Sequence, residues 1–125
     1  MRFVIAALFV IHGVAHLVGF VVPWRIATLE ETPYKTTILN GKVNVGDAGI
    51  RAVGALWLVT AAAYAVCAVA VALQLHWWFW AAAFTTLVSF GLTIVGWPES
   101  RIGVAVNGLI AIALIGSALG WLAVM

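Results

Sequence analysis

Four long apolar runs alternate with short polar segments along the chain. They cover about residues 3–22, 50–73, 77–96 and 102–124. A helix needs about 20 mostly apolar residues to cross a bilayer, and each run meets this length. The pattern therefore predicts four membrane-spanning helices, which together form a single transmembrane domain over residues 1–125.

The longest polar segment, at about residues 24–49, separates the first two runs. It holds most of the charged residues of the chain, namely Arg25, Glu30, Glu31, Lys35, Lys42 and Asp47. Asn40-Gly41 is a turn signal, so residues 38–43 are expected to form a short surface element or a lid. The other two connections are short, and short connections join antiparallel neighbours. We expect an all-α, up-down four-helix bundle with a long polar loop between helices one and two.

Composition supports a membrane location. Hydrophobic residues make up 66% of the chain and charged residues 8%, whereas soluble domains have about 45–50% and about 25%. The net charge of +2 comes without a basic run, which argues against nucleic acid as a partner. The single cysteine, Cys67, excludes an intrachain disulfide and a CxxC redox pair, and we interpret it as a core residue.

Lysine and arginine placement predicts the orientation in the membrane. The first and third loops share one side, which carries Arg25, Lys35, Lys42, Arg51 and Arg101. Arg2 and the amino terminus lie on the other side. The positive-inside rule then puts the first and third loops in the cytoplasm. The first apolar run resembles a signal peptide at its start, but it continues past His16, so we interpret it as a retained helix.

Two histidines four residues apart, His12 and His16, lie inside the first apolar run. Ionisable groups within membrane spans are rare and are usually functional. At about 1.5 Å per residue, His12 falls near the midplane and His16 about one turn nearer the long loop. Asn107 enters the fourth helix to a similar depth from the same side. These residues therefore predict a polar pocket that opens toward the long loop.

The i, i+4 spacing predicts which faces meet in this pocket. One stripe on the first helix contains Ile5, Leu8, His12, His16 and Gly19, and one on the third contains Thr85, Ser89, Thr93 and Gly96. Polar groups in a membrane need partners, so both stripes should face the bundle interior. We assign ligand contact to His16 and Asn107, proton transfer or tuning to His12, and pairing with an anionic headgroup to Arg51. Further lining residues are expected to be Ser89, Thr93, Trp57 and Trp97.

Each of these residues also has a structural interpretation. The histidines can simply hydrogen-bond to neighbouring helices and lock their packing. Arg51 can anchor a helix end at the interface. Glu99 is interpreted as a solvated loop charge.

A metal centre is not predicted. Two histidines at i, i+4 supply two ligands, but the only nearby acid is Glu99 at the pocket mouth. Both histidines project from the same face of one helix, so they cannot clamp a haem between them. One of them remains open as a single axial ligand. A quinone or another lipophilic ligand needs only a polar donor in an apolar slot, so the cofactor stays unidentified.

Three functions fit the sequence. We favour a pocket that binds a lipophilic ligand or cofactor of the quinone, lipid or haem class. A non-enzymatic accessory or assembly subunit of a larger membrane complex, and a small proton-coupled transporter, are the alternatives. Gly116 and Gly120 form a GxxxG pattern in the fourth run, which is typical of helices that pack against a second protomer or a larger complex.

Several residues carry a family resemblance. They are the His-Gly-x-x-His of His12–His16, the pattern of Gly49, Arg51, Gly54 and Trp57, and Trp97-Pro98 followed by Gly103 and Asn107. With four short helices, this layout resembles small uncharacterised bacterial membrane proteins, similar in outline to the DoxX-like four-helix proteins. The resemblance implies a bacterial inner-membrane location and a role beside redox or lipid metabolism, and it implies no catalytic residues. The size is also similar to the small multidrug resistance transporters, but the first helix lacks their glutamate and the first loop is longer.

Overall fold

The computed structural model describes residues 1–121. In chain order its elements are α1 (Arg2–His16), α2 (Val18–Val21), β1 (Thr37–Ile38), β2 (Val43–Asn44), α3 (Gly46–Ala72), α4 (Trp78–Val95) and α5 (Arg101–Ala118). Four helices are long and apolar enough to cross a membrane: the run Arg2–Val21 formed by α1 and α2, and then α3, α4 and α5. The prediction of four such helices is therefore confirmed.

The helix α3 corresponds to the second apolar run. It begins at Gly46, four residues before the start that the apolar pattern predicts. The backbone N–H of Gly46 donates to the side-chain oxygen of Asn44 at 2.9 Å. Gly46 has a φ of +72°, which glycine adopts without steric cost. Asp47 then lies in the first turn, where a negative charge suits the helix dipole. Hydropathy does not report this polar first turn, which explains the difference.

The last helix, α5, ends at Ala118 instead of about residue 124, and the predicted residues 122–124 lie outside the described part. Gly120 has a φ of +77°, and the N–H of Trp121 donates to the carbonyl of Gly116 at 2.7 Å. A glycine in the left-handed region commonly ends a helix in this way. Gly120 is therefore beyond the helix, so the expected helical GxxxG with Gly116 is wrong. A dimer or complex through these two glycines stays a prediction.

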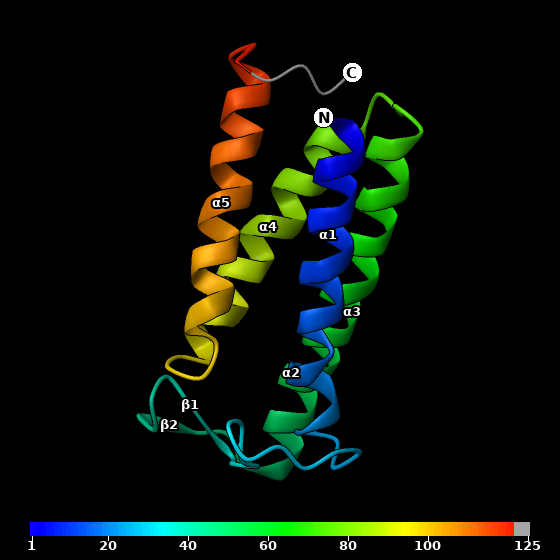
Figure 1. Cartoon of the computed structure of the whole chain (residues 1–125). Helices are drawn as coiled ribbons and strands as arrows, with labels where there is room; N and C mark the ends of the chain where they lie inside the picture. The colour runs from blue at the N-terminus through cyan, green and yellow to red at the C-terminus, as the bar shows by residue number, and fades with distance from the viewer. Residues whose placement is uncertain (122–125) are drawn as a thin grey trace.

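The helices α1, α3, α4 and α5 lie alongside one another, with the amino terminus and the α3–α4 connection at one end (Figure 1). The hairpin and the α4–α5 connection lie at the other end. The helices α1 and α3 approach each other closely at Gly13, where an added Cβ would lie 3.1 Å from Cβ of Tyr64 and 3.2 Å from the carbonyl oxygen of Ala61. A larger residue there would push the two helices apart.

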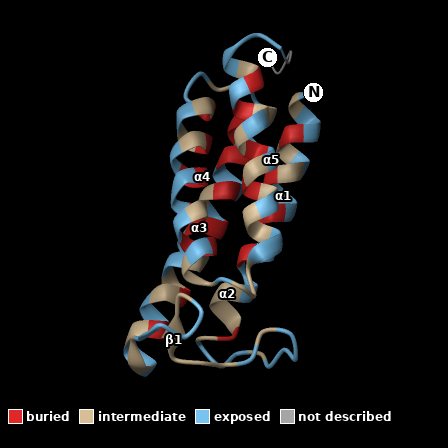
Figure 2. Ribbon diagram, turned by 90° about the vertical axis from the view of Figure 1, so that its left-hand side faces the viewer, coloured by how far each residue is buried: buried red, intermediate tan, exposed pale blue. Residues whose placement is uncertain are grey.

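Buried positions line the inner faces of the helices, as Figure 2 shows in red. The apolar core includes Ile5, Phe9, Tyr64, Val71, Trp78, Ala82, Ile110 and Leu114. Large apolar side chains also cover the outer faces, for example Trp80 (74% exposed) and Phe84 (70% exposed). Soluble monomers rarely expose contiguous apolar surface on this scale, whereas lipid tails cover it at no cost.

The segment between α2 and α3 is folded around a small β-hairpin. Thr37 pairs with Asn44 and Ile38 with Val43, and the predicted Asn40-Gly41 turn joins the strands with positive φ at both residues. The N–H of Leu39 donates to the carbonyl of Val95 at 2.9 Å, which ties the hairpin to the end of α4. The predicted surface element over residues 38–43 is therefore present.

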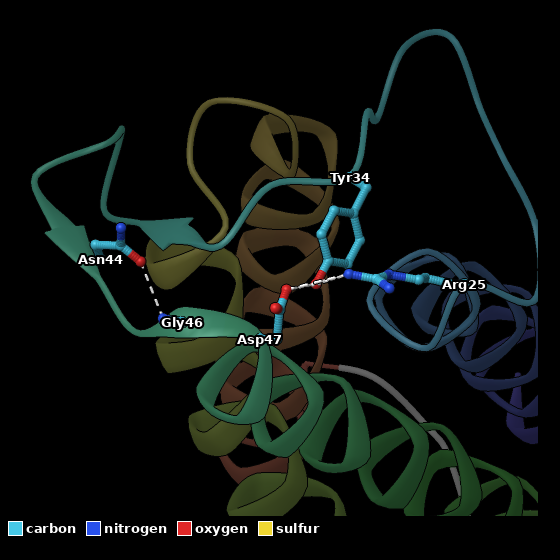
Figure 3. A network of polar contacts seen from close by, with 5 residues as sticks. All are labelled: Arg25, Tyr34, Asn44, Gly46 and Asp47. Carbon is cyan, nitrogen blue, oxygen red and sulfur yellow. Dashed lines mark hydrogen bonds and ion pairs between the residues drawn. The ribbon is translucent and has the colours of Figure 1, made fainter.

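A polar network joins the beginning, middle and end of this segment (Figure 3). Nη2 of Arg25 lies 3.2 Å from Oδ1 of Asp47 and 3.2 Å from the hydroxyl of Tyr34. Tyr34 also donates to Asp47, and the guanidinium of Arg25 lies 4.5 Å from the centre of the Tyr34 ring. These contacts hold the segment against the first turn of α3.

Candidate functional site

A cluster of polar side chains occupies the interior of the helix bundle. His12 and His16 come from α1, Tyr64 from α3, Ser89 from α4 and Asn107 from α5, and each is buried, with at most 3% of its surface exposed. The two predicted polar stripes on the first and third apolar runs thus face inward, with Ile5, His12, His16, Thr85, Ser89 and Thr93 all buried. Polar groups in an apolar interior need hydrogen-bond partners, and the cluster supplies them internally.

The histidines connect three helices through short hydrogen bonds. Nε2 of His12 lies 2.8 Å from Oδ1 of Asn107, which joins α1 to α5. Nε2 of His16 lies 2.7 Å from Oγ of Ser89, which joins α1 to α4. The hydroxyl of Tyr64 on α3 lies 3.2 Å from the same oxygen of Asn107. Chain segments up to 95 residues apart are joined here.

The partners fix where the protons are. Nδ1 of His16 donates to the carbonyl of His12 at 2.7 Å, because a carbonyl oxygen only accepts. For the neutral ring, Nε2 of His16 is then an acceptor, and the hydroxyl of Ser89 donates to it. Nε2 of His12 donates to Oδ1 of Asn107, and Nδ2 of Asn107 donates to Oγ1 of Thr93 at 3.4 Å. All these bonds are consistent with two neutral imidazoles that carry their protons on different nitrogens.

A cavity of about 350 Å³ extends from the histidines to the segment between α2 and α3. Its inner end includes His12, His16, Trp57 and Thr93. Its aliphatic walls include Val18, Val22, Ile50, Val53, Ile102 and Val106. Its mouth includes Pro33, Tyr34, Lys35, Ile38 and Glu99. A small polar end below a mostly apolar slot is the usual composition of a small-molecule site.

The wall beside His16 depends on a glycine. A Cβ added to Gly19 would lie 2.2 Å from Cδ2 of Trp57, closer than two carbon atoms can approach. The indole of Trp57 therefore occupies the space that a side chain at position 19 would fill, with its ring centre 5.0 Å from that of His16. Gly19 was predicted on the histidine stripe, and this contact explains why a glycine stands there.

An ion pair lies at the mouth of the cavity. Nζ of Lys35 lies 2.8 Å from Oε1 of Glu99, and the side chains are 36% and 23% exposed. Burial alone would raise the pKa of Glu99, but the hydrogen bond and the charge of Lys35 outweigh it and hold this pKa below its usual value. Glu99 is therefore not the freely solvated loop charge that we expected, and it joins the α4–α5 connection to the segment after α2.

The predicted site residues separate into three groups. His12, His16, Trp57 and Thr93 line the cavity. Asn107 and Ser89 lie behind the histidines and hydrogen-bond to them without lining the cavity. Arg51 and Trp97 take no part in the cavity wall, so their expected contact with a ligand there is corrected.

Arg51 faces outward because it packs on another anchor residue. Its guanidinium lies 4.6 Å from the centre of the Trp24 ring, and the indole N–H of Trp24 donates to the carbonyl of Arg51 at 2.9 Å. This geometry supports the alternative interpretation of Arg51 as an anchor at the helix end. Trp97 is 45% exposed at the α4–α5 connection.

Sequence reasoning missed Tyr64 and the role of Lys35. Tyr64 is fully buried, and its ring centre lies 5.1 Å from that of His12 and 5.4 Å from that of His16. A signal for Tyr64 was present, because Trp57, Ala61, Tyr64, Ala68 and Val71 recur at helical spacing. No comparable signal marks Lys35, since its partner lies 64 residues away.

No protein-family model, curated protein or solved structure matches this chain. The resemblance to DoxX-like four-helix proteins therefore stays a prediction. Within residues 1–121, no group of three histidine, cysteine or acidic side chains is placed to hold a metal ion.

Proposed function

We propose that this protein binds a lipophilic small molecule inside the membrane, with the polar end of the ligand beside His12. The proposal depends on one observation, the 350 Å³ cavity that ends on two buried imidazoles and is otherwise mainly aliphatic. Its volume falls within the range of small-molecule sites, about 300–1,000 Å³. A polar head at the histidines and an apolar body along Val53, Val106 and Ile102 would match these walls.

The hydrogen bonds favour His12 over His16 as the ligand contact. Both ring nitrogens of His16 already have partners, so a ligand that bound this ring would have to break one of these bonds. His12 uses only Nε2 within the described residues. We therefore propose His12, and not His16 as expected from the sequence, for the ligand contact, and Asn107 becomes a residue that orients His12.

In the membrane, we propose an up-down bundle with the long polar loop and the α4–α5 connection on the cytoplasmic side of a bacterial inner membrane. Five of the six lysine and arginine residues lie at that end, namely Arg25, Lys35, Lys42, Arg51 and Arg101. The positive-inside rule supports this orientation. The ligand would then enter near the cytoplasmic face, past Lys35 and Glu99.

Native mass spectrometry after gentle release from the membrane tests the proposal. The unmodified protein should carry a small-molecule adduct, and Val53→Phe should lose it because the new ring fills the cavity. Val59→Phe is the matched control, since Val59 is on the same helix but is 64% exposed on the outer face. If Val53→Phe keeps the adduct, or if the native protein carries only another polypeptide, the cavity is not the binding site. A bound polypeptide would favour the accessory subunit instead.

A further inference from the structure

One ring nitrogen of the histidine pair is left free by the protein. Nε2 of His12 lies 2.8 Å from Asn107 and 3.4 Å from Ser89, but Nδ1 of His12 has no hydrogen-bond partner within residues 1–121. Among these residues, Oε2 of Glu99 is the only side-chain polar atom that has neither accessible surface nor a hydrogen-bond partner. Nδ1 of His12 is not such an enclosed atom, and because His12 lines the cavity we infer that Nδ1 faces it.

The tautomer of His12 decides what this nitrogen can do. Because Nε2 carries the proton that is donated to Asn107, Nδ1 of a neutral ring carries a lone pair and is an acceptor. The donors of Ser89 and His16 are already in use, since Ser89 donates to His16 and His16 donates to the carbonyl of His12. The inner end of the cavity therefore offers an acceptor and no free donor from the histidine pair.

We propose that the ligand is a neutral lipophilic alcohol or phenol whose hydroxyl donates to Nδ1 of His12. This inference rests on the proposed binding in the cavity, and it adds the chemical class of the ligand's polar group. A ketone or a quinone would place its carbonyl oxygen against the lone pair of Nδ1, so two acceptors would face each other. Sites built around a hydrogen bond reject analogues that cannot make it, so this end of the cavity should select hydroxyl compounds over carbonyl compounds.

Borneol and camphor are suitable probes, because they share a rigid carbon skeleton and differ only in a hydroxyl or a carbonyl group. Binding of each to the purified protein in detergent would be measured by competition and by ¹⁵N NMR of labelled histidine. We expect borneol to bind about three- to tenfold more tightly than camphor, which is the worth of one hydrogen bond. Borneol should shift the unprotonated Nδ1 resonance of His12, whereas exposed His76 at the other end of the bundle is the internal reference.

His12→Gln is the variant that isolates Nδ1. A glutamine amide reaches the position of Nε2 and keeps a donor toward Asn107, and its acceptor oxygen lies one bond further from Cγ than Nδ1 does, so no acceptor stands at the position of Nδ1. The variant should bind both probes equally. Equal binding by the native protein, a preference for camphor, or a protonated Nδ1 in the NMR spectrum would overturn the inference and leave the cavity proposal intact. If neither probe binds the native protein, both this inference and the cavity proposal fail. The NMR measurement on native protein decides the tautomer even if the variant does not fold.

Discussion

Nε2 of His16 lies 2.7 Å from Oγ of Ser89, and this bond joins α1 to α4 at a point where both residues are at most 1% exposed. The other ring nitrogen of His16 is held by the carbonyl of His12 at 2.7 Å. The imidazole is therefore fixed at both nitrogens, and it forms part of the bundle interior as well as one end of the cavity.

Ser89→Ala should destabilise the protein because it leaves Nε2 of His16 buried without a partner. An unsatisfied buried polar group costs about 1–3 kcal/mol. Ser117→Ala on α5 is the control, since Ser117 is only partly buried and its side chain makes no hydrogen bond in the described structure. The free energy of unfolding in detergent is the measurement. Equal stability of the two variants would mean that the Ser89 contact contributes nothing.

Tyr64→Phe should cost less, about 0.5–1.5 kcal/mol, because it removes one hydroxyl and keeps the ring. That hydroxyl lies 3.1 Å from Oγ1 of Thr86 and 3.2 Å from Oδ1 of Asn107. Since Tyr64 does not line the cavity, ligand affinity measured by titration should change little while unfolding shifts. A large loss of affinity with unchanged stability would contradict this separation.

Gly19→Ala should disturb the cavity, because its Cβ would lie 2.2 Å from the indole of Trp57 and the ring must move. We expect weaker ligand binding and a changed tryptophan environment. Gly91→Ala is the control, because no atom lies within 4 Å of a Cβ added there and the residue is inside α4. That substitution should be neutral or stabilise the helix by up to about 1 kcal/mol. Similar ligand affinities in the two variants would show that the position of Trp57 does not matter for binding.

The sequence was sufficient to predict the four apolar helices, because hydropathy alone reports them. It was also sufficient to predict that His12, His16, Ser89 and Asn107 lie near one another, since helical spacing and rise per residue convert sequence position into face and depth. It failed at Arg51 because depth does not reveal direction. The guanidinium is exposed and packs on Trp24 instead of lining the cavity.

Contacts made by loops were not predictable in the same way. The pairing of Lys35 with Glu99 joins residues 64 positions apart, and neither residue belongs to a periodic pattern. The bond between Leu39 and Val95, which ties the hairpin to the end of α4, also has no local signal. Both contacts require the end of α4 to lie beside the segment that follows α2, and this proximity is a property of the whole fold.

Acid should loosen residues 32–39, which include Lys35 at the mouth of the cavity, because protonation of Glu99 removes the charge that Lys35 contacts. Burial alone would raise the pKa of Glu99, but Lys35 holds it below its ordinary value. A carboxylate whose pKa is lowered in the folded state stabilises the fold. This stabilisation is fully present above the pKa of glutamate in the unfolded state, about 4.3. This contribution is lost as pH falls through the folded-state pKa. Both side chains are partly exposed, so solvent screens the pair and the effect should be modest.

Hydrogen exchange of amides in residues 32–39 is the measurement, taken as the ratio of Glu99→Gln to native protein at each pH. This ratio cancels the intrinsic pH dependence of exchange. At neutral pH the variant should exchange faster, because it has lost the charge that Lys35 contacts at 2.8 Å. Below the folded-state pKa of Glu99 the ratio should approach one, since the native carboxyl is then also neutral. Glu30→Gln, at an exposed position in the same segment, should give a ratio near one throughout. If the Glu99→Gln ratio is independent of pH, the ion pair does not hold this segment over the cavity.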